Sequence, residues 1–264
     1  MIKYIISAFF IYFLTGLMIF LFQRKILFNI SGKPNKPEDY GLNKIKELKI
    51  QTSDGVGLLA WFSMPKPNLP LLVYFHGNSF DIGERAHRIK RYINNGWGVL
   101  LLAWRGYSGN LGKPTEKNLY IDGESAIKWI IDNLNFDYEN LIIYGESLGC
   151  AVAVDLGTRY KFKSIVLESP FTSILDIARR RYKIYPCKYF ILDKFDNYSK
   201  IDKILSPVLI ISGKRDEVVP HSHSDKLFLK ANNPKKNLFI DEAMHNNLYD
   251  FNIDKEVIEF NSLI

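Results

Sequence analysis

A serine lies at the centre of the pentapeptide Gly145-Glu146-Ser147-Leu148-Gly149. The apolar run 141–144 precedes it and the small-residue run 150–154 follows it, which predicts a strand, a sharp turn and a helix. Glycines at both ends leave room for a tight turn that lifts the serine hydroxyl above the sheet. The pattern therefore indicates a nucleophile elbow, with Ser147 as the predicted nucleophile.

A serine hydroxyl is a weak nucleophile at neutral pH, so it requires an imidazole that accepts its proton and a carboxylate that orients the imidazole. After an elbow of this kind, the acid and then the histidine follow along the chain. Asp216 comes just after the apolar run 207–212, and His245 lies in a predicted loop between the strand 238–240 and the terminal helix. We predict Asp216 as the orienting acid and His245 as the general base.

The carboxylates have alternative roles. Asp216 can instead cap the helix that is expected to begin near Pro220. Glu168, at the end of the apolar run 164–167, is the rival acid, because a carboxylate one strand earlier can reach the same histidine. A turn or capping role suits Glu168 better, and the order of residues favours Asp216.

Two other parts of the sequence contain histidines that suggest a function. His221 and His223, followed by Asp225, superficially suggest a metal site. Residues two apart do not share a helix face, so we expect a solvated helix start, no metal and no cofactor. His76 follows the predicted strand 71–75, and we expect its ring to brace the next loop rather than to act as a base.

That loop also has a predicted role in the chemistry. Attack on a carbonyl places negative charge on oxygen, and each backbone N–H that stabilises it is worth roughly 3 kcal/mol. We predict that Leu148, at the start of its helix, provides one N–H of this oxyanion hole and Asn78 the other, with Ser79 as the next choice.

Seven short segments together resemble one known family. They are YFHGN at 74–78, RGY at 105–107, YGESLG at 144–149, ESPFTS at 168–173, PVLI at 207–210, DEVVP at 216–220 and HN at 245–246. In this order they resemble the α/β-hydrolase superfamily, and more narrowly the Bem46 and ABHD17/ABHD13-like group of membrane-attached serine hydrolases. The resemblance extends from about Leu48 to Tyr249.

The resemblance implies Ser147 as nucleophile, Asp216 as acid and His245 as base. It also implies an α/β-hydrolase fold with a mostly parallel eight-stranded sheet, helices on both faces and a short cap. Ala103-Trp104 before Arg105 and Cys150 after the elbow depart from the group's usual residues, which affects the expected substrate range more than the chemistry.

The composition suits one domain with an appendage. The chain has 264 residues, of which 47% are hydrophobic and 24% charged. Its two cysteines, Cys150 and Cys187, lack ligand spacing, so neither a disulfide framework nor a zinc site is indicated. The net charge of +7 is spread along the chain without a nucleic-acid motif, so we expect an anionic membrane surface rather than nucleic acid as partner.

The appendage is the first segment. Tyr4 to Phe22 is apolar except at Ser7, Thr15 and Gly16. At about 1.5 Å per residue, a helix of this length spans close to the ~30 Å hydrocarbon core of a bilayer. Because it lacks the cleavage site of a signal peptide, we predict an uncleaved membrane anchor rather than an interfacial helix or a peptide trimmed elsewhere.

Basic residues near the anchor predict its orientation. Lys3 precedes the anchor, whereas Arg24, Lys25, Lys33 and Lys36 follow it. By the positive-inside rule, the hydrolase domain faces the cytoplasm.

Beyond the anchor, apolar strands alternate with helices, which predicts a mostly parallel sheet covered on both faces. We expect an anchor at 1–25, a linker at 26–40 and an α/β-hydrolase domain at 41–264, with the cap at about 170–206. Bases and aromatics are mixed over 177–190, which fits either lipid headgroup contacts or a solvated helix with a few core aromatics.

These observations predict a membrane-anchored serine hydrolase that cleaves esters or thioesters through an acyl-enzyme intermediate. Its expected substrates are lipid-like or acylated proteins, and its oligomeric state is left open. A serine peptidase is one alternative, for which Glu168 is the only obvious amine-binding acid. A non-catalytic, membrane-tethered binding module is the other.

Overall fold

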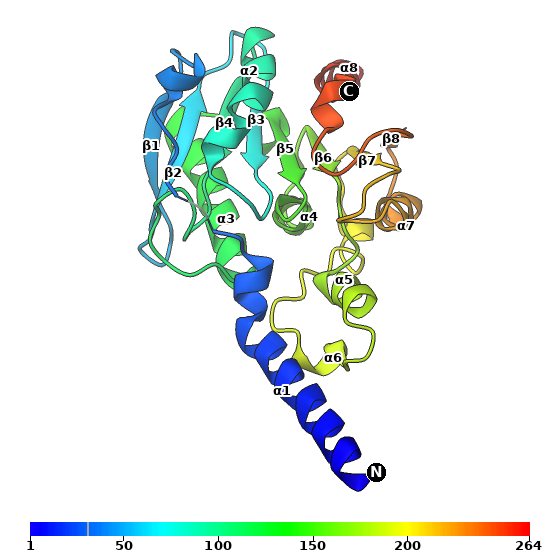
Figure 1. The fold of residues 1–264 in the computed structure, drawn as a ribbon. Coiled ribbons are helices and arrows are strands. Elements are labelled where there is room, and N and C mark those ends of the chain that lie inside the picture. Colours follow the sequence, from blue (N-terminus) through cyan, green and yellow to red (C-terminus); the bar gives the residue numbers. More distant parts are fainter. Residues whose placement is uncertain (31) are drawn as a thin grey trace.

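The computed structural model describes residues 1–30 and 32–264. Its centre is an eight-stranded sheet with the order β1-β2-β4-β3-β5-β6-β7-β8 (Figure 1). The strands are β1 (Lys46–Gln51), β2 (Gly57–Ser63), β3 (Leu71–Phe75), β4 (Gly98–Leu102), β5 (Leu141–Glu146), β6 (Ser164–Glu168), β7 (Val208–Gly213) and β8 (Lys235–Ile240).

The sheet is mostly parallel, as predicted. Only β2 pairs antiparallel with its neighbours β1 and β4, and the other pairs are parallel. Every residue of β3 to β7 is buried, which explains their continuous apolar runs. The carboxyl ends of β3, β5, β7 and β8 therefore meet at one edge.

Helices cover both faces of the sheet, as predicted. The helices are α1 (Ile2–Leu27), α2 (Ala86–Asn94), α3 (Glu116–Leu134), α4 (Gly149–Gly157), α5 (Ile174–Arg181), α6 (Cys187–Phe190), α7 (Ser222–Lys230) and α8 (Ile253–Ser262). Side chains of α3, α4 and α7 belong to one core cluster, and those of α2 and α8 to a second. The sheet therefore separates two cores.

Two elements lie outside this layered body. The segment between β6 and β7 forms α5 and α6, in the region predicted as a cap. The helix α1 projects from the body and runs beside them (Figure 1). It is long and apolar enough to cross a membrane, with a mean hydropathy of 2.4, and none of its residues is buried.

The predicted linker at 26–40 is closely associated with the body. Ser31 lies outside the described residues. Phe28 is buried, the Asn29 N–H donates to the Asn78 carbonyl at 3.0 Å, and Pro37 begins a short 3-10 helix at Pro37–Tyr40. The end of α1 is thus held against the loop that follows β3.

Candidate active site

The predicted elbow has the geometry that lifts a side chain out of a sheet. Ser147 follows β5 with a φ of 49°, in the left-handed region, and its N–H donates to the Glu168 carbonyl at 2.8 Å. A Cβ on Gly145 would lie 2.6 Å from Cys150 Cα, and one on Gly149 would overlap the Phe75 carbonyl oxygen. Both positions therefore require glycine, and the strained turn presents the serine hydroxyl.

The two predicted partners of the serine lie together. Asp216 follows β7 and His245 follows β8, and His245 Nδ1 lies 2.7 Å from Asp216 Oδ2. The other carboxylate oxygen accepts the N–H groups of Val218 and Val219 at 2.9 and 2.8 Å. The Asp216 side chain is fully buried, whereas that of His245 is 12% exposed. Hydrogen bonds to both carboxylate oxygens therefore fix the orientation of Asp216.

This pair defines the chemistry available to the imidazole. Donation from His245 Nδ1–H to Asp216 leaves Nε2 free to accept a proton. Among the described residues, no hydrogen bond joins the Ser147 hydroxyl to His245. Such contacts are often long before substrate binds. The rival acid, Glu168, instead bonds to Tyr144 at 2.6 Å and to Arg88 at 3.2 Å.

The two predicted oxyanion N–H groups are available. Leu148 precedes α4, Asn78 follows β3, and both line the same cavity as Ser147. Within residues 1–30 and 32–264, neither N–H has a hydrogen-bond acceptor. The Asn78 carbonyl instead accepts the Tyr107 hydroxyl at 2.9 Å, and its side chain donates to the Leu27 carbonyl at 2.9 Å. The end of α1 thus helps to hold this loop.

A buried ion-pair cluster lies behind the elbow, which the sequence analysis missed. Arg85 Nη2 lies 2.8 Å from Glu146, and Arg85 Nη1 donates to the Ser79 carbonyl at 2.7 Å. Burial opposes ionisation of Glu146, but the guanidinium groups of Arg85 and Arg88 outweigh it and hold its pKa well below the usual range. Arg85 therefore ties the oxyanion loop to the elbow. The glutamate inside the elbow pentapeptide was the available signal.

His76 braces the oxyanion loop, as expected. Its Nδ1 lies 2.7 Å from the Gly77 carbonyl, and its Nε2 accepts the Trp104 N–H at 3.4 Å. Burial, with a further contribution from Arg85, lowers its pKa from 6.5 to about 3. The ring is therefore neutral, and both of its nitrogens are hydrogen-bonded.

The expectation that His221 and His223 form a solvated helix start is wrong. His221 Nδ1 lies 2.9 Å from Ser212 Oγ, and the buried His223 lies 2.7 Å from Thr172 Oγ1. Both rings satisfy polar groups of the body. Across the part of the chain that the structure describes, no group of His, Cys, Asp and Glu side chains could hold a metal ion.

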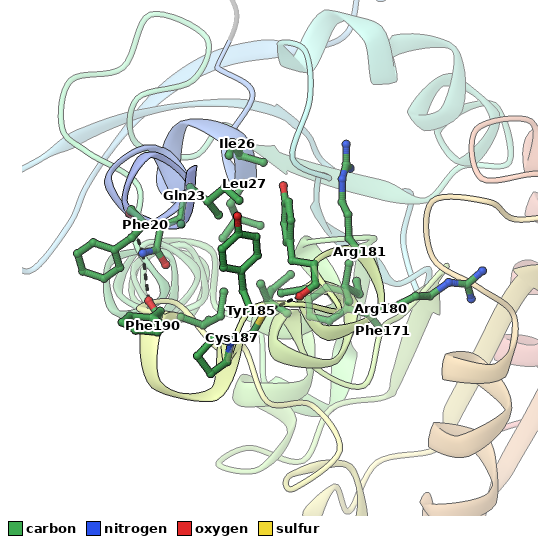
Figure 2. A pocket seen from close by; sticks show the side chains of 18 of the residues that line it. Phe20, Gln23, Ile26, Leu27, Phe171, Arg180, Arg181, Tyr185, Cys187 and Phe190 are labelled. Atoms are coloured by element: carbon green, nitrogen blue, oxygen red, sulfur yellow. Dashed lines mark hydrogen bonds between the residues drawn. The ribbon is translucent and has the colours of Figure 1, made fainter. Parts of the chain in front are cut away.

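A cavity of about 1060 Å³ extends from Ser147 away from the sheet. One wall is α1 from Tyr12 to Leu27, and the facing wall consists of α5, α6 and the turn between them. Figure 2 shows the side chains of Phe20, Gln23, Ile26 and Leu27 on one side and those of the cap on the other. The cavity is mostly apolar, so a hydrocarbon chain suits it better than a polar one.

Comparisons with known proteins define the class. Residues 106–247 match the model of the prolyl oligopeptidase family. The fold is that of the Pyrococcus furiosus esterase Pf2001, with a TM-score of 0.72 and 20% identity over 89% of this chain and 97% of that one. The esterase Est1E of Butyrivibrio proteoclasticus gives a TM-score of 0.69 at 22% identity, over 82% of this chain and 100% of the other.

Two relatives narrow the family. Human alpha/beta hydrolase domain-containing protein 17B is 37% identical over 75% of this chain and 68% of its own length. The uncharacterized protein Rv2307c of Mycobacterium tuberculosis is 30% identical over 88% of this chain and 84% of its own. The chain belongs to the α/β-hydrolase superfamily, in the ABHD17 and Bem46-like group, and it is a hydrolase by family.

Proposed function

We propose that the protein is a serine hydrolase that cleaves carboxylic esters or thioesters of lipid-like substrates through an acyl-enzyme intermediate. The hydrogen bond between His245 Nδ1 and Asp216, on the same sheet edge as Ser147, is the observation that supports this most strongly. It gives the imidazole the tautomer that a general base requires.

The proposed reaction has two halves. The Ser147 oxygen bonds to the substrate carbonyl carbon while its proton passes to His245 Nε2, and the N–H groups of Leu148 and Asn78 stabilise the oxyanion. The bond to the leaving alcohol or thiol then breaks, and His245 returns the proton to it. Water next attacks the acyl-enzyme by the same route, which releases the acid and restores the serine.

We further propose that α1 anchors the enzyme in a membrane, with the catalytic body on the cytoplasmic side. The length and apolar composition of α1 support the anchor, since a helix of 26 residues is about 39 Å long. The basic residues Arg24 and Lys25 in its last turn support the orientation. Because α1 would hold the body next to the membrane, substrates that are themselves in the bilayer are favoured.

The test is nucleophile replacement in the full-length protein in detergent. Ser147→Ala should abolish hydrolysis of p-nitrophenyl acetate and labelling by a fluorophosphonate probe. Ser199→Ala, which changes an exposed serine outside the cavity, is the matched control and should keep both. Unchanged acetate hydrolysis in Ser147→Ala would overturn the proposal. A wild-type protein that neither reacts with the probe nor cleaves the ester would support the non-catalytic alternative.

The peptidase alternative receives no support from Glu168, the amine-binding acid predicted for it. Glu168 is 1% exposed, and it is bound by Arg88 and Tyr144. Burial and the neighbouring Glu146 raise the pKa of this carboxyl despite Arg88, so it is a poor partner for a substrate amine.

A further inference from the structure

The anchor helix and the cap are packed together over a long distance. Tyr12 stacks on Tyr185 with ring centroids 4.8 Å apart, and the Thr15 and Tyr185 hydroxyls lie 2.5 Å apart. Nearer the body, Gln23 donates to the Phe190 carbonyl at 3.1 Å (Figure 2). These contacts leave about 15 Å of α1, residues 2–11, projecting beyond the cap, half of a ~30 Å hydrocarbon core.

This geometry places the cap at a defined depth if α1 crosses a bilayer. The free segment of α1, residues 2–11, fills one leaflet, so α6 and its flanking turns lie within the other, which we call the near leaflet. Large apolar side chains are exposed in this region: Ile184 is 71% exposed, Tyr189 79% and Leu192 51%. In water such a patch would be unfavourable. The exposed lysines of the same region, Lys183 and Lys188, have long side chains that can extend toward the headgroups.

Basic residues lie one layer nearer the body. The last turn of α5 contains Arg179, Arg180 and Arg181, and α5 lies between the sheet and α6 (Figure 1). Arg179 pairs with Asp176 at 3.5 Å, whereas no ion pair is found for Arg180 or Arg181 within the described chain. Both line the cavity, on the side away from Phe20 and Phe190 (Figure 2). This level suits lipid phosphates.

We propose that α1 is one wall of an acyl-chain site and not only an anchor. The groove between α1 and the cap takes one fatty acyl chain of a phospholipid from the near leaflet, with the ester carbonyl at Ser147 and the phosphate near Arg180 and Arg181. From Leu27 to Tyr12 the wall is about 22 Å long, which suits a long chain. This inference rests on the proposed serine hydrolase function and names its substrate class.

Substitutions that fill the groove provide the first test. A Cβ on Gly16 would lie 2.9 Å from Tyr185 Cε1, so Gly16→Leu obstructs the groove at this point. Leu17→Trp is a second obstruction that does not involve that contact. Met18→Trp is the matched control, because Met18 is 47% exposed and does not line the cavity. All are compared as full-length proteins in the same detergent micelles.

The readout is the ratio of p-nitrophenyl palmitate to p-nitrophenyl acetate hydrolysis. Both obstructions should lower this ratio at least about tenfold, because even two displaced methylene groups have that effect. Met18→Trp should leave the ratio at the wild-type value. A wild-type ratio in both obstructed variants would overturn the acyl-site proposal. If Ser147→Ala still abolishes acetate hydrolysis, the proposed function would stand.

The lipid source is tested with the full-length enzyme in phosphatidylglycerol vesicles. Fatty acid should be released from the lipid, and Arg180→Gln/Arg181→Gln should reduce this release several-fold more than it reduces hydrolysis of p-nitrophenyl palmitate. Release only from an S-palmitoylated peptide bound to the same vesicles would overturn the phospholipid assignment in favour of acylated protein. Equal losses on both substrates would overturn the phosphate contact.

Discussion

The sheet edge and the lobe of α1 with the cap (α5–α6) are stabilised in different ways. At the edge, Ser147 and Asp216 follow buried strands, and their backbones are fixed by glycines that nothing else can replace and by a buried carboxylate. The lobe contains no buried residue of α1 and exposes much apolar surface. The geometry of the proposed catalytic residues is therefore fixed by the body itself, whereas the proposed substrate groove depends on apolar surroundings for its stability.

The largest effect is expected on kcat, from replacement of the predicted orienting acid, Asp216. Asp216→Asn should lower kcat for p-nitrophenyl acetate about 10⁴-fold, because the amide favours the wrong histidine tautomer. Steady-state kinetics in detergent measure this. Asp241→Asn changes an exposed aspartate and should leave kcat unchanged. A similar kcat for wild type and Asp216→Asn would show that Glu168 or another group orients His245.

A second substitution, Arg85→Met, tests the stability of the sheet edge rather than its chemistry. Arg85→Met should lower the free energy of unfolding by about 3 kcal/mol, because it removes the closest partner of the buried Glu146 carboxylate. Urea unfolding followed by tryptophan fluorescence reports this, since the four tryptophans Trp61, Trp97, Trp104 and Trp129 all lie in the body.

The matched variant for this test replaces both charges. Arg85→Met/Glu146→Met should recover part of the lost stability, because no unpaired carboxylate then remains beside Arg88. The loss of unfolding free energy in the double variant could instead equal the sum of the losses in Arg85→Met and Glu146→Met. That result would show that the ion pair does not hold the loop. Esterase activity should be low in both Arg85→Met and the double variant, since the contact with the Ser79 carbonyl is missing in each.

The pH dependence of stability provides a smaller test of the edge. The pKa of His76 is about 3 in the folded state against the ordinary 6.5, so the unfolded chain binds more protons between these values. Its contribution to stability is complete above pH 6.5 and is lost as pH falls toward 3, by up to about 1.4 kcal/mol per pH unit. Urea midpoints at pH 7 and pH 5 measure the slope.

His76→Gln should flatten this slope because the amide keeps a donor and an acceptor without titrating. An unchanged slope in His76→Gln would show that the His76 ring is not held neutral in the folded protein. The lobe contributes no histidine to this dependence, since α1, α5 and α6 contain none.

The edge was largely predictable from sequence because its signals are local. An apolar strand followed by a glycine turn indicates a sheet edge, and the order Ser147, Asp216, His245 identifies the candidate residues without knowledge of their contacts. The Asp216–His245 hydrogen bond agrees with that prediction. The catalytic roles themselves stay predictions until the variants are measured.

The lobe was not predictable in the same way. Tyr12 bonds to the Ile184 carbonyl across 172 positions in the chain, and Arg24 pairs with Asp193 across 169. The pattern of α1 indicates only an apolar helix, because every side of it is apolar and no stripe marks a packed face. Likewise, Glu146 and Arg85 are 61 positions apart. The position of Glu146 inside the elbow pentapeptide is a signal for a buried charge, but nothing in the sequence identifies Arg85 as its partner.

The smallest effect is expected from a single hydroxyl in the lobe. Tyr185→Phe removes the contact with Thr15 and should make local opening of the cap about fivefold more frequent, as the loss of one hydrogen bond worth about 1 kcal/mol implies. Hydrogen exchange at the Tyr189 and Ile191 amides, which bond within the cap, measures this in detergent. Tyr189→Phe changes a tyrosine that is 79% exposed and is the matched control, read at Ile191. The tryptophan-detected unfolding of the body should not move in either variant. Suppose instead that Tyr185→Phe lowered the free energy of unfolding of the body as Arg85→Met is expected to do. Lobe and body would then unfold as one unit, and the proposed difference in how the sheet edge and the groove are stabilised would be wrong.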